Sequence, residues 1–373
     1  MSWIERYARY AWLGLRILFP TPREWRYARS IRASGLLDRT WYRETNPRLP
    51  RLCRLLPERH YVLVGEKVGL CPSPDFSPRA YSYLNPDQPR SGLPPLAHFM
   101  DKGAGGARAA LDTPAGPDAP ALPVIDAAAL AQTGQEVAIV LHLFYREMWD
   151  EFLPILRAQL FPFDLIILLT EGAPEAEIRA SIVQDFPGAH IWTFPNHGRD
   201  ILPFLHLAQS GALARYKAVC KLHTKRSPHR ADGAQWRQAL VEGVLGDPDA
   251  TQRALTAFLA DPRAALWVAD GHRISGAEWW GPNKARARAL LERFHLDATA
   301  WSDHLEFAAG SIYWMKASAL TTLAALPVSA SDFEPEMGQV DGTTAHALER
   351  VLGLVLRAQG LELRERNELS ALG

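Results

Sequence analysis

Apolar residues in the second half of the chain form short continuous runs separated by stretches of helical periodicity. The runs at 136–145, 163–170, 189–194 and 216–223 are typical of buried strands, and helical patterns lie between them at 148–156, 174–186 and 201–213. Strands without a polar face that alternate with helices indicate a parallel sheet covered on both faces. We therefore predict an α/β fold of Rossmann-like type with a mostly parallel sheet, and ligands at the carboxyl ends of its strands. Further runs predict strands at 265–270 and 305–315, a helix at 284–295 and a long helix from Thr343.

A weak duplication precedes this region. WYRETNP at 41–47 recurs as YSYLNPD at 81–87, and the histidine-aromatic pair at 60–61 recurs at 98–99, a repeat of about 39 residues. His60 and His98 fall at equivalent places, which favours a structural role over catalysis. We expect two helical repeats at 31–106, a Gly-, Ala- and Pro-rich linker at 107–135, and an α/β domain at 136–373.

Residues 1–30 combine aromatic and aliphatic side chains with six arginines. Such a segment suits a membrane headgroup interface, and equally a helix docked on its own protein by the same apolar stripe. No uninterrupted run of about 18 apolar residues occurs, so a conventional membrane span is not expected. We expect a cytoplasmic protein, with residues 1–30 as a candidate for peripheral contact at the inner face of the cytoplasmic membrane.

Composition narrows the function classes. The 41 basic residues balance 41 acidic ones, so the chain lacks the charge of a nucleic-acid-binding protein and no nucleic-acid partner is expected. Three widely spaced cysteines support neither a disulfide framework nor a zinc module. Neither GxGxxG nor GxxxxGK[ST] follows a strand, which argues against NAD enzymes and P-loop NTPases.

Polar residues follow the predicted strands. In KLHTK at 221–225, alternation of strand faces places Lys221, His223 and Lys225 on one side. Such groups repel one another unless an anion joins them, so we expect a diphosphate there, with a solvated basic turn as the alternative. NHGRD at 196–200 follows the third strand, where Asp200 is either a helix cap or part of a ligand site.

A third polar segment, at 332–352, contains several carboxylates just before the C-terminal helix and the start of that helix. Its carboxylates could simply be favourable partners of the helix dipole. Asp341 lies between Gly338 and Gly342, and such a loop is also how a general base is presented to an incoming hydroxyl group. Glu336 is the rival base, and His346 either orients a carboxylate or packs.

Six ordered motifs over some two hundred residues resemble the rhamnan synthesis protein F family of polysaccharide-building proteins. They are HLFY with Trp149, NHGRDILPFL, KLHTKRS, WWGPN at 279–283, AAGSIYWM and EMGQVDGTTAHALER. The resemblance implies a glycosyltransferase of GT-A-like fold. It would move rhamnose or a related sugar, with inversion, from a nucleotide donor such as dTDP-rhamnose to a glycan or lipid-linked glycan in lipopolysaccharide O-antigen or capsule synthesis.

The layout also resembles inverting GT-A enzymes, in which an Asn-x-Gly…Arg segment follows the third strand and a D-x-D motif closes the fourth. NHGRD matches the first feature, but KLHTK stands in the place of D-x-D. Lysine is not a metal ligand, so we expect no metal cofactor and direct stabilisation of the diphosphate by the cationic strand end.

The resemblance and the residues together suggest roles for individual side chains. Asp341, or Glu336 as its rival, would accept the proton of the acceptor hydroxyl, and Trp314 and His346 would contact the acceptor. The expected nucleoside site consists of His142, Tyr145, Asn196, Arg199 and Asp200. Two other classes stay open: a sugar-phosphate transferase, and a non-catalytic glycan-binding or scaffold protein of an assembly complex.

Overall fold

The fold was analysed in a computed structural model. It describes residues 14–370 except 48, 74–75, 77, 79–80, 82–87, 103–118, 173–174, 225–232, 277–278, 281–282, 298–303 and 337–341. The chain divides into two compact units, which are described separately. The first unit comprises Met1–Pro114, Trp280–Ala285 and Met337–Gly342, and the second comprises Ala115–Trp279, Arg286–Glu336 and Thr343–Gly373.

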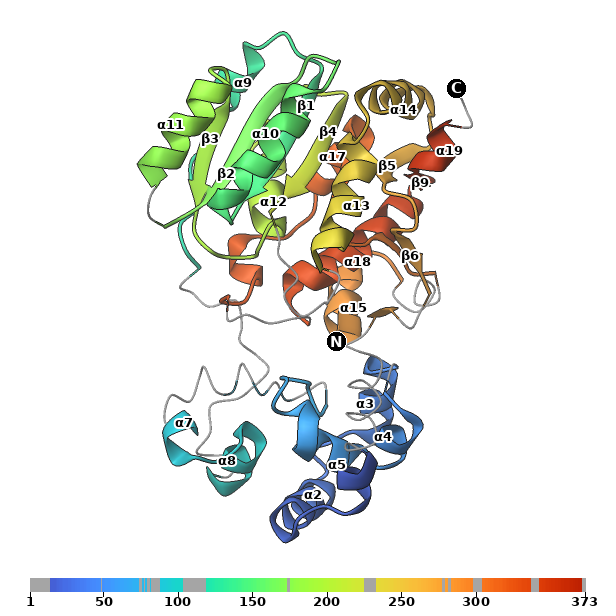
Figure 1. The fold of residues 1–373 in the computed structure, drawn as a ribbon. Coiled ribbons are helices and arrows are strands. Elements are labelled where there is room, and N and C mark those ends of the chain that lie inside the picture. The colour runs from blue at the N-terminus through green and yellow to red at the C-terminus, as the bar shows by residue number, and fades with distance from the viewer. Residues whose placement is uncertain are drawn as a thin grey trace. The chain divides into compact units, whose positions relative to one another are not determined.

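The second unit contains a seven-stranded sheet in the order β3-β2-β1-β4-β8-β5-β9 (Figure 1). Every neighbouring pair is parallel except those of β8, which runs antiparallel to both β4 and β5. The prediction of a mostly parallel sheet is therefore confirmed. The strands are β1 (Val137–Leu143), β2 (Asp164–Thr170), β3 (His190–Phe194), β4 (Ala218–His223), β5 (Ala264–Val268), β8 (Tyr313–Lys316) and β9 (Glu362–Glu365).

Helices cover both faces of the sheet, as predicted (Figure 1). On the α10 face, Cys220 and Leu222 of β4 join a large apolar cluster with side chains of the covering helices. These helices are α10 (Trp149–Arg157), α11 (Glu175–Asp185), α13 (Gly233–Leu245) and α14 (Pro248–Ala260). The opposite α12 face is covered by α12 (Ile201–Gln209), α17 (Ala317–Ala324) and α18 (Thr344–Arg357). Further helices are α9 (Ala127–Ala131), η2 (Arg146–Met148), α15 (Lys284–Arg293), η4 (Ala330–Asp332) and α19 (Arg366–Ser370).

The segment 305–315, predicted as one strand, is broken in the structure. Its first part forms β7 (Glu306–Ala308), which pairs with β6 (Arg273–Ser275) in a separate two-stranded sheet. Gly310 and Ser311 then adopt left-handed backbone conformations, with φ of 84° and 56°, before the chain enters β8. A strand cannot continue through two such residues, so the turn redirects the chain into the main sheet.

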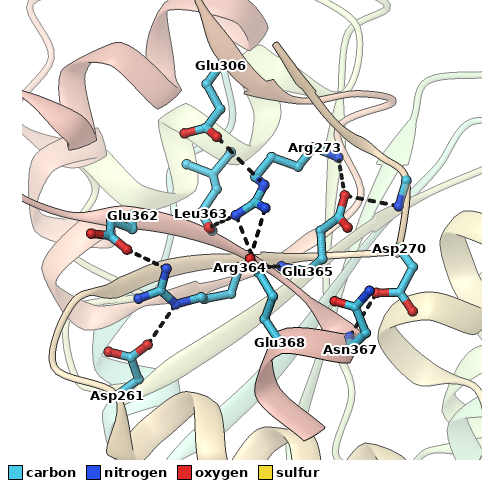
Figure 2. Close-up of polar contacts among 11 residues, drawn as sticks. Asp261, Asp270, Arg273, Glu306, Glu362, Leu363, Arg364, Glu365, Asn367 and Glu368 are labelled. Atoms are coloured by element: carbon cyan, nitrogen blue, oxygen red, sulfur yellow. Dashed lines mark hydrogen bonds and ion pairs between the residues drawn. The ribbon is translucent and has the colours of Figure 1, made fainter. Parts of the chain in front are cut away.

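Ion pairs fasten the edge strand β9 and the short helix α19 (Figure 2). Arg273 donates to the Leu363 carbonyl at 2.9 Å and to both carboxylate oxygens of Glu368 at 2.9 and 3.0 Å. Arg364 donates to Asp261 at 2.8 Å and also pairs with Glu362. A charged edge strand resists pairing with other chains, but its sequence, ELRE, gives no apolar signal from which a strand could be predicted.

Part of the expected linker is structured. Asp126 accepts hydrogen bonds from two backbone N–H groups at the start of α9, and Leu130 within this helix is fully buried. Thr133 contacts the Asp164 carboxylate, which also accepts a hydrogen bond from Tyr216 at 2.7 Å. Residues 127–133 are thus attached to the sheet of the second unit.

The first unit consists of short helices with an apolar cluster, and the expected duplication is visible in its hydrogen bonds. Tyr42 Oη lies 2.9 Å from His60 Nδ1, and Tyr81 Oη lies 2.9 Å from His98 Nδ1. Both histidines are buried, and burial lowers the pKa of His60 to about 4. The structural role predicted for both is confirmed. The elements are α2 (Pro22–Ser34), α3 (Arg39–Thr45), α4 (Arg51–Leu55), α5 (Pro57–His60), η1 (Tyr61–Gly65), α7 (Gln88–Ser91) and α8 (Pro95–Lys102).

The N-terminal segment is described from residue 14 onward. Ile17, Ala28 and Ile31 are buried in the first unit, so this part docks on its own protein. In the part of the chain that the structure describes, no helix is long and apolar enough to cross a membrane.

Candidate functional site

The carboxyl ends of β1 and β4 meet where the strand order reverses, which is where open α/β sheets bind ligands. Thr224, directly after β4, ties the two ends together. Its Oγ1 accepts hydrogen bonds from the backbone N–H groups of Phe144 and Tyr145, both at 2.9 Å, and its own N–H donates to the His142 carbonyl at 3.1 Å. The exit of β1 is therefore fixed by a buried hydroxyl group.

A buried ion pair lies beside this point, on the α12 face. Lys221 of β4 donates from Nζ to Asp200 Oδ2 at 2.5 Å, and to the carbonyl and hydroxyl oxygens of Ser311, each at 2.9 Å. Lys221 is 1% exposed and Asp200 is 9% exposed. Three acceptors match the three donors of an ammonium group, so the protein itself satisfies Lys221.

These contacts change the roles expected of the cationic strand end. An anion does lie beside Lys221 and His223, but it is the Asp200 carboxylate: His223 Nε2 lies 3.9 Å from Asp200 Oδ2 and 2.7 Å from the Gly310 carbonyl. Because Lys221 and His223 are both buried, direct contact with a diphosphate does not fit their positions. Asp200 makes no side-chain capping hydrogen bond to α12, so the alternative of a helix cap does not hold. Lys225 lies outside the described residues.

Two turns with left-handed backbone conformations border the ion pair. Arg199 has a φ of 58° and follows Gly198 at 64°, just as Ser311 at 56° follows Gly310 at 84°. A non-glycine residue in this region costs about 1–3 kcal/mol and persists only where its surroundings hold it. Two of the three such residues in the described part of the chain thus lie at this edge, where Ser311 contacts Lys221 and Arg199 precedes Asp200.

His142, on β1, is buried next to the ion pair and opposite His223 in the strand register. Its Nε2 lies 3.2 Å from Thr170 Oγ1 on β2. Burial, with smaller contributions from His223 and Lys221, lowers the pKa of His142 to about 3, although Asp200 opposes the shift. His142 is therefore neutral at physiological pH and is too buried for the expected contact with a nucleoside.

Arg199 joins two further candidates from the C-terminal part of the chain. Its Nη1 lies 3.1 Å from His346 Nε2, and its Nε lies 3.6 Å from Glu336 Oε2. A guanidinium group only donates, so His346 Nε2 is the acceptor in this contact, while Nδ1 faces Thr343, 2.7 Å from its Oγ1 and 3.4 Å from its backbone nitrogen. Burial raises the pKa of Glu336, although Arg199 and His197 act in the opposite direction.

Glu334 has a structural role at the start of α18. Its carboxylate accepts hydrogen bonds from the Thr344 N–H at 2.9 Å and the Thr344 hydroxyl at 3.1 Å, and it pairs with Arg286. A carboxylate at a helix N-terminus is favourable, as considered for this acidic segment. The two neighbouring glutamates therefore differ: Glu334 holds a helix end, and Glu336 faces Arg199.

We call the polar side chains described above, at the carboxyl ends of the strands, the polar edge. Residues 121–361, which contain all of them, match the family described as rhamnan synthesis protein F. The chain belongs to this family. Proteins named "Uncharacterized protein WxcX", from two strains of Xanthomonas campestris pv. campestris, are 37% and 36% identical to it over 222 residues. Each alignment covers 60% of this chain and 31% of the relative, so the matched part spans about a third of those proteins. Membership associates the chain with polysaccharide synthesis.

Of the other residues expected at the site of this rhamnan synthesis protein F member, Trp314 lies elsewhere. Trp314 is fully buried on the α10 face, stacked on Trp267 with ring centroids 5.8 Å apart, so contact with an acceptor sugar does not fit its position. Strand alternation explains this, because Tyr313, one residue earlier, lies 5.6 Å from the Lys221 ammonium on the other face. Tyr145 packs partly into the core, and Asn196 is exposed. Asp341 lies outside the described residues.

Three contributors to the family member's polar edge were not anticipated. Thr224 and Ser311 act through backbone geometry and carry no chemical signature in the sequence. Arg146 follows β1: its Nη2 donates to the Thr170 carbonyl at 2.9 Å, while its buried Nη1 has no hydrogen-bond partner among the residues that the structure describes. An arginine directly after a strand at the switch point could have been selected by the rule that selected Tyr145.

Proposed function

We propose that the chain is a glycosyltransferase of bacterial surface-polysaccharide synthesis. It transfers a sugar such as rhamnose, with inversion, from a nucleotide sugar like dTDP-rhamnose to a glycan or lipid-linked glycan. The observation that carries the proposal is the match to rhamnan synthesis protein F over the residues that form the sheet and its polar edge. Location of the polar residues at the strand-order reversal supports it, because such edges bind ligands.

In this proposal the donor binds over the ends of β1 and β2. Phe144 is 42% exposed, and its ring lies 4.9 Å from that of Tyr145, so the pair offers an aromatic surface for a base. Arg146 is half-buried at the same edge, where it donates to the Thr170 carbonyl, and in this proposal its guanidinium group turns toward a phosphate oxygen of the donor, a contact for which arginine is well suited. Asn196 and Lys225 complete the proposed donor contacts.

The buried ion pair serves the donor site indirectly. Asp200 and Lys221 hold the start of α12 against β4, and through Ser311 they also hold the turn at 310–311. Arg199 is thereby kept in its left-handed conformation, with its guanidinium group toward Glu336 and His346. Catalytic groups need such support from neighbours that are themselves fixed.

The transfer itself needs one proton acceptor. The acceptor hydroxyl oxygen attacks the anomeric carbon, the bond from that carbon to the diphosphate oxygen breaks, and the hydroxyl proton passes to a carboxylate. Asp341 remains our proposed base and Glu336 its rival. The pKa of Glu336 is raised, which makes its carboxylate a stronger proton acceptor.

A resident divalent metal does not fit the residues present at the end of β4. Lys221 occupies a place where the GT-A resemblance expects an acidic ligand, and its ammonium group is already bound to Asp200. Among the described residues, no three histidine, cysteine, aspartate or glutamate side chains gather as metal donors. We therefore propose no step that passes through a metal.

The test combines binding and turnover. The full chain is titrated calorimetrically with a panel of nucleotide sugars, and release of nucleoside diphosphate is measured in the presence of glycan acceptors. Binding of one donor with acceptor-dependent release is expected. Release of nucleoside monophosphate would indicate transfer of a sugar phosphate, and absence of all binding would indicate a scaffold; either result refutes the proposal.

Variants assign the base. Asp341→Asn should abolish turnover and leave donor binding nearly unchanged, whereas unchanged turnover removes Asp341 and directs the test to Glu336→Gln. If Glu336 is the base, the wild-type rate rises with pH through its raised pKa, because the ionised form is required. Glu292→Gln, at an exposed carboxylate paired only along its own helix with Arg288, is the matched control.

A further inference from the structure

Exposed apolar side chains are concentrated near the start of the described chain. Among the residues that the structure describes, eleven large hydrophobic side chains are exposed, and four of them lie within residues 15–25. Leu15 is 58% exposed, Leu18 50%, Phe19 70% and Trp25 44%. We call these four residues the outer patch. Single exposed hydrophobic residues are ordinary on a protein surface, but a cluster marks an interaction site.

The segment that carries the outer patch is packed on the first unit. Ile17, between Leu15 and Leu18, is fully buried with Cys53 and Leu63, and α2 packs through Ala28 and Ile31. Arg59 Nη1 donates to the Ile17 carbonyl at 2.9 Å and to the Leu18 carbonyl at 3.3 Å, which fixes the backbone at residues 17 and 18. The buried side of this segment is therefore already used in packing, and the side chains of the outer patch are the apolar groups of this segment that stay exposed.

Charge is segregated in the same part of the sequence. The whole chain is neutral, yet residues 1–72 contain fourteen arginines and lysines against six aspartates and glutamates. Arg23, Arg26, Arg29 and Arg32 are exposed on α2, and the Arg29 guanidinium lies 5.3 Å from the centre of the Trp25 ring. Glu24, the one acidic residue between 14 and 34, is paired with Arg16 at 2.6 Å.

We propose that the outer patch and its arginines bind the surface of an anionic lipid bilayer. Arginines complement lipid phosphates, and leucine, phenylalanine and tryptophan side chains bury in the boundary between headgroups and acyl chains. A nucleic acid would satisfy the arginines but would leave the exposed leucines and Phe19 in water. The two features together therefore favour lipid, and they do so independently of the proposed transferase activity.

Vesicle sedimentation of the full chain tests this. Phosphatidylcholine vesicles containing about one third phosphatidylglycerol should bind the protein, with weaker binding at high salt, and pure phosphatidylcholine should not. Leu18→Ser with Phe19→Ser should weaken binding by about tenfold or more. Arg26→Gln with Arg29→Gln should weaken it about fivefold for each arginine removed.

The control is Leu160→Ser, which changes a leucine of the second unit that is 59% exposed and should leave binding unchanged. Circular dichroism and thermal unfolding establish that each variant is folded. Equal binding to both vesicle types, no binding to either, or wild-type binding by the Leu18/Phe19 variant overturns the proposal. The proposal is also overturned if the protein binds duplex DNA equally well with and without the Leu18 and Phe19 replacements and does not bind the anionic vesicles.

Discussion

Replacing Asp200 by asparagine tests whether the ion pair at the sheet edge is a buried charge pair or an incidental contact. Asparagine keeps the size and one oxygen but removes the negative charge. Lys221 would then be 1% exposed with only neutral acceptors, namely the two Ser311 oxygens at 2.9 Å and the remaining amide oxygen, in place of the carboxylate. Removing one partner of a buried ion pair costs about 3–5 kcal/mol, a large fraction of the roughly 5–15 kcal/mol that stabilises a typical domain.

The measurement is the free energy of unfolding in urea, followed by circular dichroism and tryptophan fluorescence. An exposed pair provides the matched control: Lys217 Nζ lies 2.6 Å from Glu136 Oε1, with the two side chains 59% and 65% exposed. Glu136→Gln should change stability by less than about 1 kcal/mol. The contrast between two lysine-carboxylate pairs of similar length isolates the effect of burial.

A double replacement completes the test. Lys221→Met combined with Asp200→Leu removes both charges and fills the space with apolar groups, which is often neutral or stabilising for buried pairs. The double variant should therefore lose less stability than Asp200→Asn alone. The reasoning is wrong if Asp200→Asn lies within about 1 kcal/mol of the wild type, or if the double variant is the less stable of the two.

Three further changes follow from the same edge. His142 has a pKa of about 3 in the folded chain, so between about pH 6.5 and pH 3 the unfolded chain binds a proton at this residue that the folded chain does not. The free energy of unfolding therefore falls as the pH falls through this range. His142→Gln should make this loss shallower, by up to about 1.4 kcal/mol per pH unit, in urea melts. Thr224→Val keeps the shape but deprives the Phe144 and Tyr145 N–H groups of their acceptor, and should cost about 1–3 kcal/mol for each buried donor and weaken donor binding; unchanged calorimetry would contradict the role given to Thr224. Gly198→Ala places a Cβ 2.4 Å from Leu202 Cβ at a φ of 64°, so a loss of about 1–3 kcal/mol is expected, and an unaltered melting temperature would exclude this close approach.

Most of the strands that could be predicted are buried on both faces; β3, which is half-buried, is the exception. β1, β2 and β4 lie within the predicted apolar runs because a central parallel strand needs apolar residues at every position. β9 could not be found, since an edge strand fastened by Arg364 and its partners has no apolar run. The break at Gly310 and Ser311 was missed because backbone conformation there is set by contacts with Lys221 and His223.

The site could be located but not resolved from the sequence. Face alternation predicted Lys221 and His223 on one side of β4, and in the structure both lie near the Asp200 carboxylate. The pairing of Lys221 with Asp200 could not be predicted, because the two partners lie 21 residues apart and meet only when α12 packs on the sheet. The chemistry of Trp314 suits contact with a sugar, but side chains of β8 alternate between the two faces of the sheet, and its place in this alternation puts Trp314 in the core.

The ion pair also constrains how β4 can align with its neighbours. Along this strand, Cys220 and Leu222 project into the apolar cluster of the α10 face, whereas Lys221 projects toward Asp200. Sliding β4 by a single position would exchange the two sets, forcing an ammonium group among tryptophan rings and stranding a carboxylate opposite a thiol or an isobutyl group. A misaligned sheet would therefore bury both an ammonium group and a carboxylate without their partners, so Lys221 favours a single alignment of β4.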